Sequence, residues 1–242
     1  PTAVRQATRV TTVSAYEAGR IAERFPDAAD RLAVVSNAVS ERFAPVSDPV
    51  RLAEVRERYG LYERFAFLLG NTDPKKNIPA AVEAYVRYAE RVPQAVKLVV
   101  ADLAPERLDE MLRGLGAEHL RDRFVLPGYM AHADLAAVYS LCDAFLYPSL
   151  RESFGLPILE AMASGAPVIT SDAASMPEVA GDAALLVDPR RPETIADALE
   201  QVLTSPPVRR TLRERGLRQA ATFSWDHAAR LMLAEYDTVL AA

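Results

Sequence analysis

Short apolar runs alternate with amphipathic helical patterns through most of the chain. The runs are rich in Val, Leu, Ile and Phe without polar alternation, and they cover residues 65–69, 96–100, 123–126, 144–147, 168–170 and 184–187. Unbroken apolar runs of this length are typical of strands buried on both faces, as in a parallel sheet covered by helices. The alternation therefore predicts an α/β fold, a Rossmann-like domain with a doubly wound parallel sheet.

Helical patterns fill the segments between these runs, and only helices follow the last run. The predicted helices cover residues 78–92, 106–113, 132–140, 158–163, 192–203, 208–221 and 225–240. The consecutive prolines 206 and 207 should separate two of them, and Ser224 should cap the last one. We expect Trp225 to anchor that last helix in the core.

The first forty residues differ from this rhythm. They predict a strand at 9–13, a helix at 15–25 and a strand at 32–36, which is too little for an independent core. The sequence also begins at Pro1 without an initiating methionine. We interpret residues 1–40 as the end of an absent N-terminal domain plus an interdomain strand, and residues 41–242 as the Rossmann-like domain. A single domain with a decorated N-terminus is the alternative.

Charge and cysteine content exclude several classes of protein. The formal net charge is -5 and no Lys/Arg-rich run is present, so nucleic acid is not an expected partner. The single cysteine, Cys142, excludes an internal disulfide and a cysteine-based zinc site, and its apolar neighbours predict a buried, inert thiol. No apolar run approaches a membrane span of ~20 residues and no signal peptide opens the chain, so we expect a cytoplasmic protein.

The predicted sheet indicates where a ligand would bind. In a doubly wound sheet, ligands lie beyond the carboxyl ends of the strands, where the strand order reverses. If the order is 3-2-1-4-5-6, the loops that follow Leu69 and Tyr147 flank this point. Both of these loops have unusual chemistry, whereas the other loops after strands are plainer.

The first loop combines a glycine with two lysines. Gly70 would allow a tight turn and a close approach by a ligand. Lys75 and Lys76 stand before a predicted helix with Asn77 as N-cap and Pro79 in the first turn. An ammonium group beside a helix N-terminus suits a phosphate. A solvated charged turn explains these residues equally well.

The second loop lies between two carboxylates, Glu152 and Glu160. We expect the N–H groups of Phe154, Gly155 and Leu156 to be unpaired donors, with Gly155 leaving room for a phosphate. Glu160, in the predicted first helical turn, is also explained by the helix dipole alone. Carboxylates commonly bind vicinal hydroxyls. The two loops together suggest a ligand with hydroxyls at both ends and a diphosphate between them, as in a nucleotide sugar.

Residues 152–160 resemble the E-x7-E motif of retaining glycosyltransferases with the two-domain GT-B fold. The surrounding sequence resembles the large family-4 group at Gly128, 143–149, 154–157, 160–163, Gly165, 167–168, 178–179 and 187–189. Residues 34–38 are similar to the interdomain strand that usually ends in Pro-Asn-Gly. The resemblance extends over nearly the whole chain and implies the C-terminal, donor-binding half of a GT-B fold with a helical C-terminus.

The resemblance implies a role for each site residue. Glu152 would contact the donor sugar as the catalytic carboxylate, Glu160 would bind the ribose hydroxyls, and Lys76 would contact the diphosphate. The remaining donor-binding residues would be Gly70, Asn71, Lys75, Leu126 (near the base), Ser153, Phe154, Gly155 and Leu156. The family implies no metal and no cofactor, with the nucleotide sugar as co-substrate.

Three departures from the family pattern stand out. Asn71 replaces a common arginine, so diphosphate binding would be weaker or would use Lys75 or Arg151. A similar Gly-Asn occurs in a subgroup resembling mannosyl- and rhamnosyl-type transferases, which hints at a GDP-linked sugar. Ser153 replaces a frequent glycine. The N-terminal domain, which would supply the acceptor site and a histidine near the sugar, is absent. We expect none of His119, His132 and His227 to replace that histidine, and we place His132 in a helix.

The implied reaction is retaining transfer of a hexose-type sugar from a GDP-, UDP- or dTDP-linked donor to a hydroxyl acceptor, in bacterial glycan or glycoconjugate synthesis. The fragment alone would be inactive. Any peripheral membrane association would use the absent domain, which the last helix would brace. Alternatives are a non-catalytic nucleotide-sugar-binding subunit and a sugar-nucleotide epimerase. A phosphorylase would need a lysine in an apolar setting for pyridoxal phosphate, and a dehydrogenase would need G-x-G-x-x-G after Leu69. Neither is found.

Overall fold

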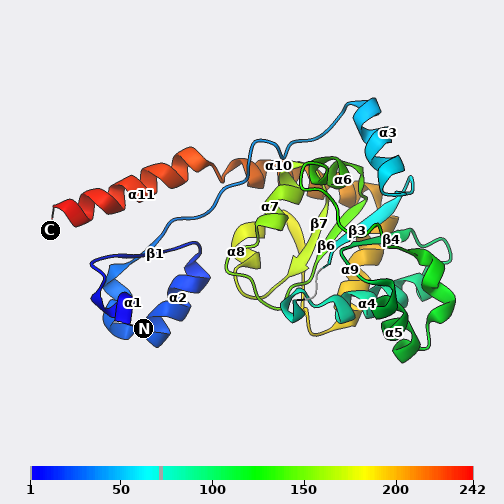
Figure 1. The fold of residues 1–242 in the computed structure, drawn as a ribbon, viewed down its shortest axis with the longest axis horizontal. Helices are drawn as coiled ribbons and strands as arrows, with labels where there is room; N and C mark the ends of the chain where they lie inside the picture. The colour runs from blue at the N-terminus through cyan, green and yellow to red at the C-terminus, as the bar shows by residue number, and fades with distance from the viewer. Residues whose placement is uncertain (1, 71–72, 242) are drawn as a thin grey trace.

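A computed structural model describes residues 2–70 and 73–241, and its larger sheet has six parallel strands (Figure 1). In spatial order the strands are β5 (Phe124–Val125), β4 (Lys97–Ala101), β3 (Phe65–Leu69), β6 (Ala144–Tyr147), β7 (Val168–Ser171) and β8 (Ala184–Val187). Numbered along the chain, this order is 3-2-1-4-5-6. The predicted doubly wound sheet and its strand order are therefore confirmed.

Both faces of this sheet are buried. Along β3, Phe65 and Phe67 belong to one apolar core, whereas Ala66 and Leu68 belong to the other. The core with Ala66 and Leu68 is completed by α4 (Ile78–Arg91), α5 (Pro105–Leu115) and α9 (Pro192–Thr204). The opposite core is completed by α3 (Pro49–Arg58), α6 (Leu135–Leu141), α7 (Leu156–Ala163) and α8 (Met176–Ala180). Helices on both faces explain why the strand sequences are uninterrupted apolar runs.

The two helices at the C-terminus differ in part from the sequence-based predictions. The helix expected at 208 begins two residues earlier, as α10 (Pro206–Ala221), because prolines fit the first helical turn, where their absent N–H groups have no intrahelical partner. Ser224 caps α11 (Trp225–Leu240) by accepting a hydrogen bond from the His227 N–H at 3.2 Å, as expected. Trp225 is 54% exposed, so the prediction that it is a core anchor is wrong.

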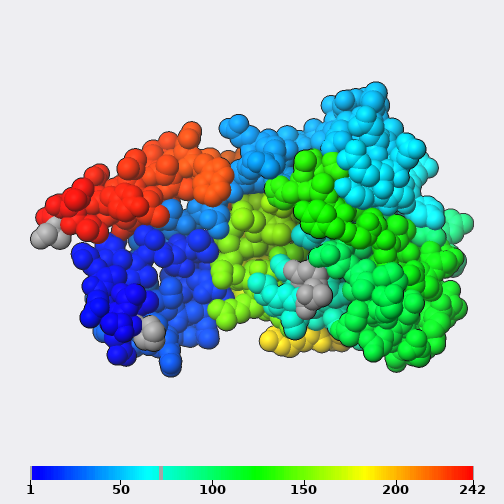
Figure 2. Space-filling model, in the orientation of Figure 1, coloured from blue at the N-terminus to red at the C-terminus, as the bar shows by residue number. Residues whose placement is uncertain are grey.

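A smaller unit precedes the large sheet. It contains α1 (Thr2–Gln6), β1 (Val10–Thr12), α2 (Ala15–Arg24), a 3-10 turn (Pro26–Arg31) and β2 (Leu32–Val34), with β1 and β2 parallel. The chain then crosses to α3, and α11 returns along the N-terminal unit (Figure 2). An ion pair of 2.5 Å between Arg9 Nη2 and Glu235 Oε2 joins that unit to α11.

Cys142 is buried, and burial raises the pKa of its thiol, in agreement with the predicted inert role. Among the described helices, none has both the length and the apolar character of a membrane span.

Candidate functional site

The loops after β3 and β6 lie side by side, because these strands pair directly and the chain order reverses between them. A backbone hydrogen bond of 2.7 Å from the Leu150 N–H to the Lys75 carbonyl joins the loops. Asn77, at the end of the first loop, donates from Nδ2 to the carbonyls of Pro148 at 3.1 Å and Pro189 at 2.7 Å. The two loops therefore form one structural unit at the predicted ligand-binding point.

The structure gives Gly70 a packing role beside the expected one, and it shows that Asn77 does not cap α4 through its side chain. A Cβ atom on Gly70 would lie 2.4 Å from the carbonyl oxygen of Ala101, so the glycine is required by packing against the end of β4. Its φ angle is not in the left-handed region. Asn77 precedes α4 but has φ of 59°, and its side chain does not cap the helix. Asn71 lies outside the described residues.

A lysine, a tyrosine and a glutamate meet where the loops come together. Lys76 follows Pro74 and Lys75 in a 3-10 turn, and its Nζ lies 2.7 Å from Glu152 Oε1 and 2.5 Å from the Tyr147 hydroxyl. The Tyr147 hydroxyl is also 2.9 Å from Glu152 Oε1. The side chains of Lys76 and Glu152 are 13% and 12% exposed. We call Lys76, Tyr147 and Glu152 the switch-point triad.

The other two candidate cations of this region are more exposed. Lys75 Nζ lies 3.5 Å from Asp73 Oδ2 and 3.9 Å from Glu152 Oε2. Arg151, the other predicted substitute for the usual arginine, pairs with Glu17 of α2 at 3.3 Å. Of these two cations, Lys75 is therefore the one that the structure places beside the triad.

The loop between the two glutamates is held by buried hydroxyls. Ser175 Oγ is 2.9 Å from both the Glu152 and the Phe154 carbonyl oxygens, and Ser14 Oγ donates to the Ser153 carbonyl at 2.7 Å. Gly155 has φ of 100°, which favours glycine, and α7 begins at the next residue, Leu156. Within the described part of the chain, the N–H groups of residues 154–156 donate no hydrogen bond. This agrees with the prediction of free donors.

Glu160 lies in the second turn of α7, and the prediction of the first turn is wrong because the helix begins two residues earlier than expected. Its side chain is 14% exposed, and His132 Nε2 lies 3.6 Å from its Oε1. Burial raises the pKa of Glu160, and His132 and Arg42 lower it in part. His132 precedes α6, which begins at Leu135, so its placement in a helix is also wrong.

His132 is the residue near Glu160 that sequence reasoning missed. Its Nδ1 lies 3.4 Å from Nη1 of Arg42, and Phe43 packs edge-on against its ring with centroids 5.2 Å apart. The predicted base-contacting residue, Leu126, directly follows β5 and packs, half-buried, against the core formed with α4 and α5. Ser149 and Ser171 also line the strand ends, where Ser171 Oγ donates to the Ser149 carbonyl at 2.7 Å.

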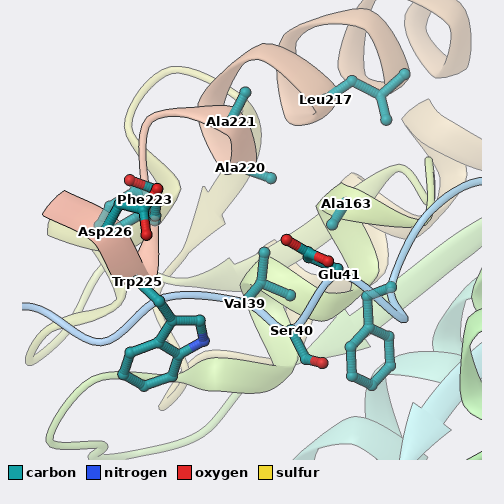
Figure 3. A pocket seen from close by; sticks show the side chains of 12 residues that line it. Val39, Ser40, Glu41, Ala163, Leu217, Ala220, Ala221, Phe223, Trp225 and Asp226 are labelled. Carbon is teal, nitrogen blue, oxygen red and sulfur yellow. The ribbon is translucent and has the colours of Figure 1, made fainter. Parts of the chain in front are cut away.

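Several hollows lie outside the switch-point triad. One of about 380 Å³ is bounded by the segment at Val39, the end of α7 and the start of α11, and Trp225 is on its rim (Figure 3). Another, of about 280 Å³, lies between the starts of α4 and α5, beside Asp102 and Arg107. Glu152 and Glu160 line neither of them. Among the described residues, no group of three or more His, Cys, Asp or Glu side chains is arranged to hold a metal.

The six-stranded parallel sheet and the helices around it match the fold of solved proteins of the GT-B type. A glycosyltransferase from Rickettsia africae superposes with a TM-score of 0.84 at 18% identity, over 96% of this chain and 64% of that one. The Anabaena protein HepE, in complex with UDP and glucose, superposes with a TM-score of 0.80 at 19% identity, over 99% and 65%. At these identities the similarity shows the fold alone.

The family model for glycosyl transferases group 1 matches residues 54–219, and the chain belongs to this family. The serotype-specific mannosyltransferase WbdA of Escherichia coli is 33% identical over 238 residues, which cover 97% of this chain and 29% of that protein. O-antigen chain mannosyltransferase B of Escherichia coli is 33% identical over 220 residues, or 90% of this chain and 57% of that protein. The chain thus spans less than two thirds of the length of these relatives.

Proposed function

We propose that the chain binds the nucleotide-sugar donor of a retaining glycosyltransferase. The switch-point triad carries the proposal, since it places a poorly exposed carboxylate and a poorly exposed ammonium together at the ligand-binding edge of the sheet. Glu160 adds a second carboxylate within α7, the helix that follows the Glu152 loop, and burial raises its pKa, as is typical of functional groups. The reaction would transfer a hexose-type sugar to a hydroxyl acceptor in bacterial glycan or glycoconjugate synthesis, and we place it in the cytoplasm.

The chemistry follows from the charges at the site. The bond between the anomeric carbon and the diphosphate oxygen breaks, and that oxygen leaves with the electron pair. Lys76 and the free N–H groups of residues 154–156 at the start of α7 would stabilise the developing negative charge. The acceptor oxygen then forms the new bond to the anomeric carbon, and its proton passes to the departing diphosphate oxygen. We propose no role for a metal or a cofactor, as the family resemblance implies.

The named relatives favour a mannose-type sugar. Two mannosyltransferases are each 33% identical to this chain, and the Gly-Asn sequence at positions 70–71 resembles a mannosyl- and rhamnosyl-type subgroup. HepE, with the same fold, is solved with UDP and glucose, so a uridine nucleotide is the second candidate. We therefore infer a GDP-linked donor, with UDP- and dTDP-linked donors to be tested beside it.

Calorimetric titration of the chain with GDP, UDP and dTDP tests this proposal. We expect saturable binding of one nucleotide, and at least a tenfold loss of affinity in Glu160→Ala because the ribose hydroxyls lose their acceptor. Glu193→Ala, on the exposed surface of α9, is the matched control and should bind like the original chain. A folded sample that binds none of the three nucleotides would contradict the proposal.

A further inference from the structure

The last residue of β6 brings a phenol into the switch-point triad. Tyr147 is 1% exposed as a whole residue, yet its hydroxyl reaches both Lys76 and Glu152. Tyr147 ends β6, whereas Lys76 and Glu152 lie in the loops that follow β3 and β6. Lys76 Nζ also lies 4.7 Å from the centroid of the Tyr147 ring.

The hydrogen bonds within the triad follow from the donors and acceptors of its three side chains. Burial raises the pKa of Tyr147 well above neutral pH, with the Glu152 carboxylate as the next cause, so the phenol keeps its proton. Its single O–H donates to Glu152 Oε1 at 2.9 Å. Lys76 has three N–H donors and no acceptor, so it donates to the Tyr147 oxygen at 2.5 Å and to Glu152 Oε1 at 2.7 Å. Glu152 Oε1 is therefore held from two directions.

The two oxygens of Glu152 consequently have different environments. Among the described residues, the contact of Oε2 is an ion pair with Lys75 Nζ at 3.9 Å, which is too long for a hydrogen bond. Oε2 is thus the oxygen that can accept from a sugar hydroxyl. A diphosphate that draws Lys76 away from Oε1 would leave the poorly exposed carboxylate with the phenol as its remaining partner in the triad.

We propose that Tyr147 is a positioning residue, which keeps Glu152 oriented toward the donor sugar when Lys76 turns to the diphosphate. This inference rests on the proposed function of the same site. Its distinctive consequence is that the hydroxyl of Tyr147 contributes to recognition of the sugar and little to recognition of the nucleotide. The Tyr147 ring, which stacks on Phe145 at 5.7 Å, would fill the core equally well as phenylalanine.

Tyr147→Phe removes the hydroxyl and retains the ring. Calorimetry would measure Kd for the nucleoside diphosphate and for its nucleotide sugar, with GDP and GDP-mannose as the first pair and UDP and UDP-glucose as the second. We expect the Kd of the diphosphate to change by less than threefold, because Lys76 is retained. The Kd of the nucleotide sugar should rise by about tenfold, the loss of one charge-assisted hydrogen bond.

A double-mutant cycle with Glu152→Gln separates positioning from simple stability. If Tyr147 acts through Glu152, Tyr147→Phe in the Glu152→Gln background should change the nucleotide-sugar Kd by less than twofold. Equal losses for diphosphate and nucleotide sugar, an unchanged nucleotide-sugar Kd, or a variant too unstable to titrate would each overturn the positioning role. If the original chain binds no nucleotide, the proposed function itself fails. If it binds and only Tyr147→Phe is silent, the inference alone fails.

Discussion

At the scale of single residues, the two adjacent lysines provide a matched pair. Lys76 is nearly buried in the switch-point triad, whereas Lys75 is 46% exposed beside Asp73. Lys76→Met should weaken binding of a nucleoside diphosphate by about 10- to 100-fold, because a poorly solvated ammonium is lost opposite the phosphates. Lys75→Met should weaken it by less than about threefold. Calorimetry on both variants checks this, and equal losses would show that Lys76 has no special role.

Glu160 gives a prediction about stability and pH. The pKa of Glu160 is higher in the folded chain than the ordinary glutamate pKa of 4.5. At pH values between these two pKa values, the folded chain therefore binds the proton more tightly than the unfolded chain does. Stability therefore falls as the pH rises through this window, and the cost of the buried charge is complete above it. Glu160→Gln should raise Tm by about 1–3 °C at pH 7.5. The gain should shrink toward pH 4.

Thermal unfolding at several pH values measures that difference. Glu193→Gln, whose carboxylate is exposed and has a lowered pKa, should show no gain at pH 7.5 and serves as the control. A Tm gain for Glu160→Gln that is equal at pH 4 and pH 7.5 would mean that the glutamate charge is not its source.

Sequence reasoning found the charged residues of the site but not their partners. Glu152, Glu160 and Lys76 were identifiable because the E-x7-E spacing and the loop after the first strand are visible in the sequence. Tyr147 contacts Lys76 and Glu152 because β3 and β6 pair directly. His132 lies near Glu160 because α6 begins only at Leu135, which leaves His132 in the preceding loop. A tyrosine that ends a strand at the reversal point was the available signal for Tyr147.

At the scale of elements, the close contact between β3 and β4 can be tested with two glycines. Gly70→Ala would place a Cβ atom 2.4 Å from the Ala101 carbonyl, so we expect a loss of about 2–3 kcal/mol in unfolding free energy. Gly114 lies in α5, and a Cβ atom there would meet nothing within 4 Å outside its own helix. Gly114→Ala should therefore stabilise the fold by roughly 0.5–1 kcal/mol. Urea unfolding measures both changes. If Gly70→Ala leaves the free energy of unfolding unchanged, β4 can shift to accept the added Cβ atom at little cost.

Strands were easier to predict than helices of weak amphipathicity. The strands at 144–147 and 184–187 agree residue for residue, because both are apolar runs with clear boundaries. Helix α3 was not predicted because its apolar residues are sparse, although Asp48 and Pro49 are a normal cap and first-turn pair. Helix α8 was not predicted either, because its five residues are too few for a helical period to be visible.

At the scale of the whole molecule, the N-terminal unit contacts the loop that carries Glu152. The carboxylate of Glu178, in α8, accepts hydrogen bonds from the N–H groups of Ala15 and Tyr16 at 2.9 and 3.3 Å, and so covers the start of α2. Ser14 holds the Ser153 carbonyl in the same region. No local pattern predicts contacts between residues so far apart in sequence, and they require the fold itself.

Removal of the Glu178 carboxylate should loosen the contact between α8 and the start of α2. Glu178→Ala should cost about 1 kcal/mol locally, and the amides of Ala15 and Tyr16 should exchange hydrogen roughly fivefold faster. Glu23→Ala, which removes an exposed ion pair with Arg20 in the same helix, should leave their exchange unchanged. Hydrogen exchange followed by mass spectrometry or NMR compares the two variants. Equal rates in both would show that Glu178 does not hold α2.

We propose that a nucleoside diphosphate binds where the strand order reverses. A crystal structure of the chain with the nucleotide selected by titration would locate it. We expect the ribose hydroxyls at Glu160, and the phosphates between Lys76 and the start of α7. A nucleotide found instead in the hollow beside Trp225, or in the one beside Arg107, would contradict it.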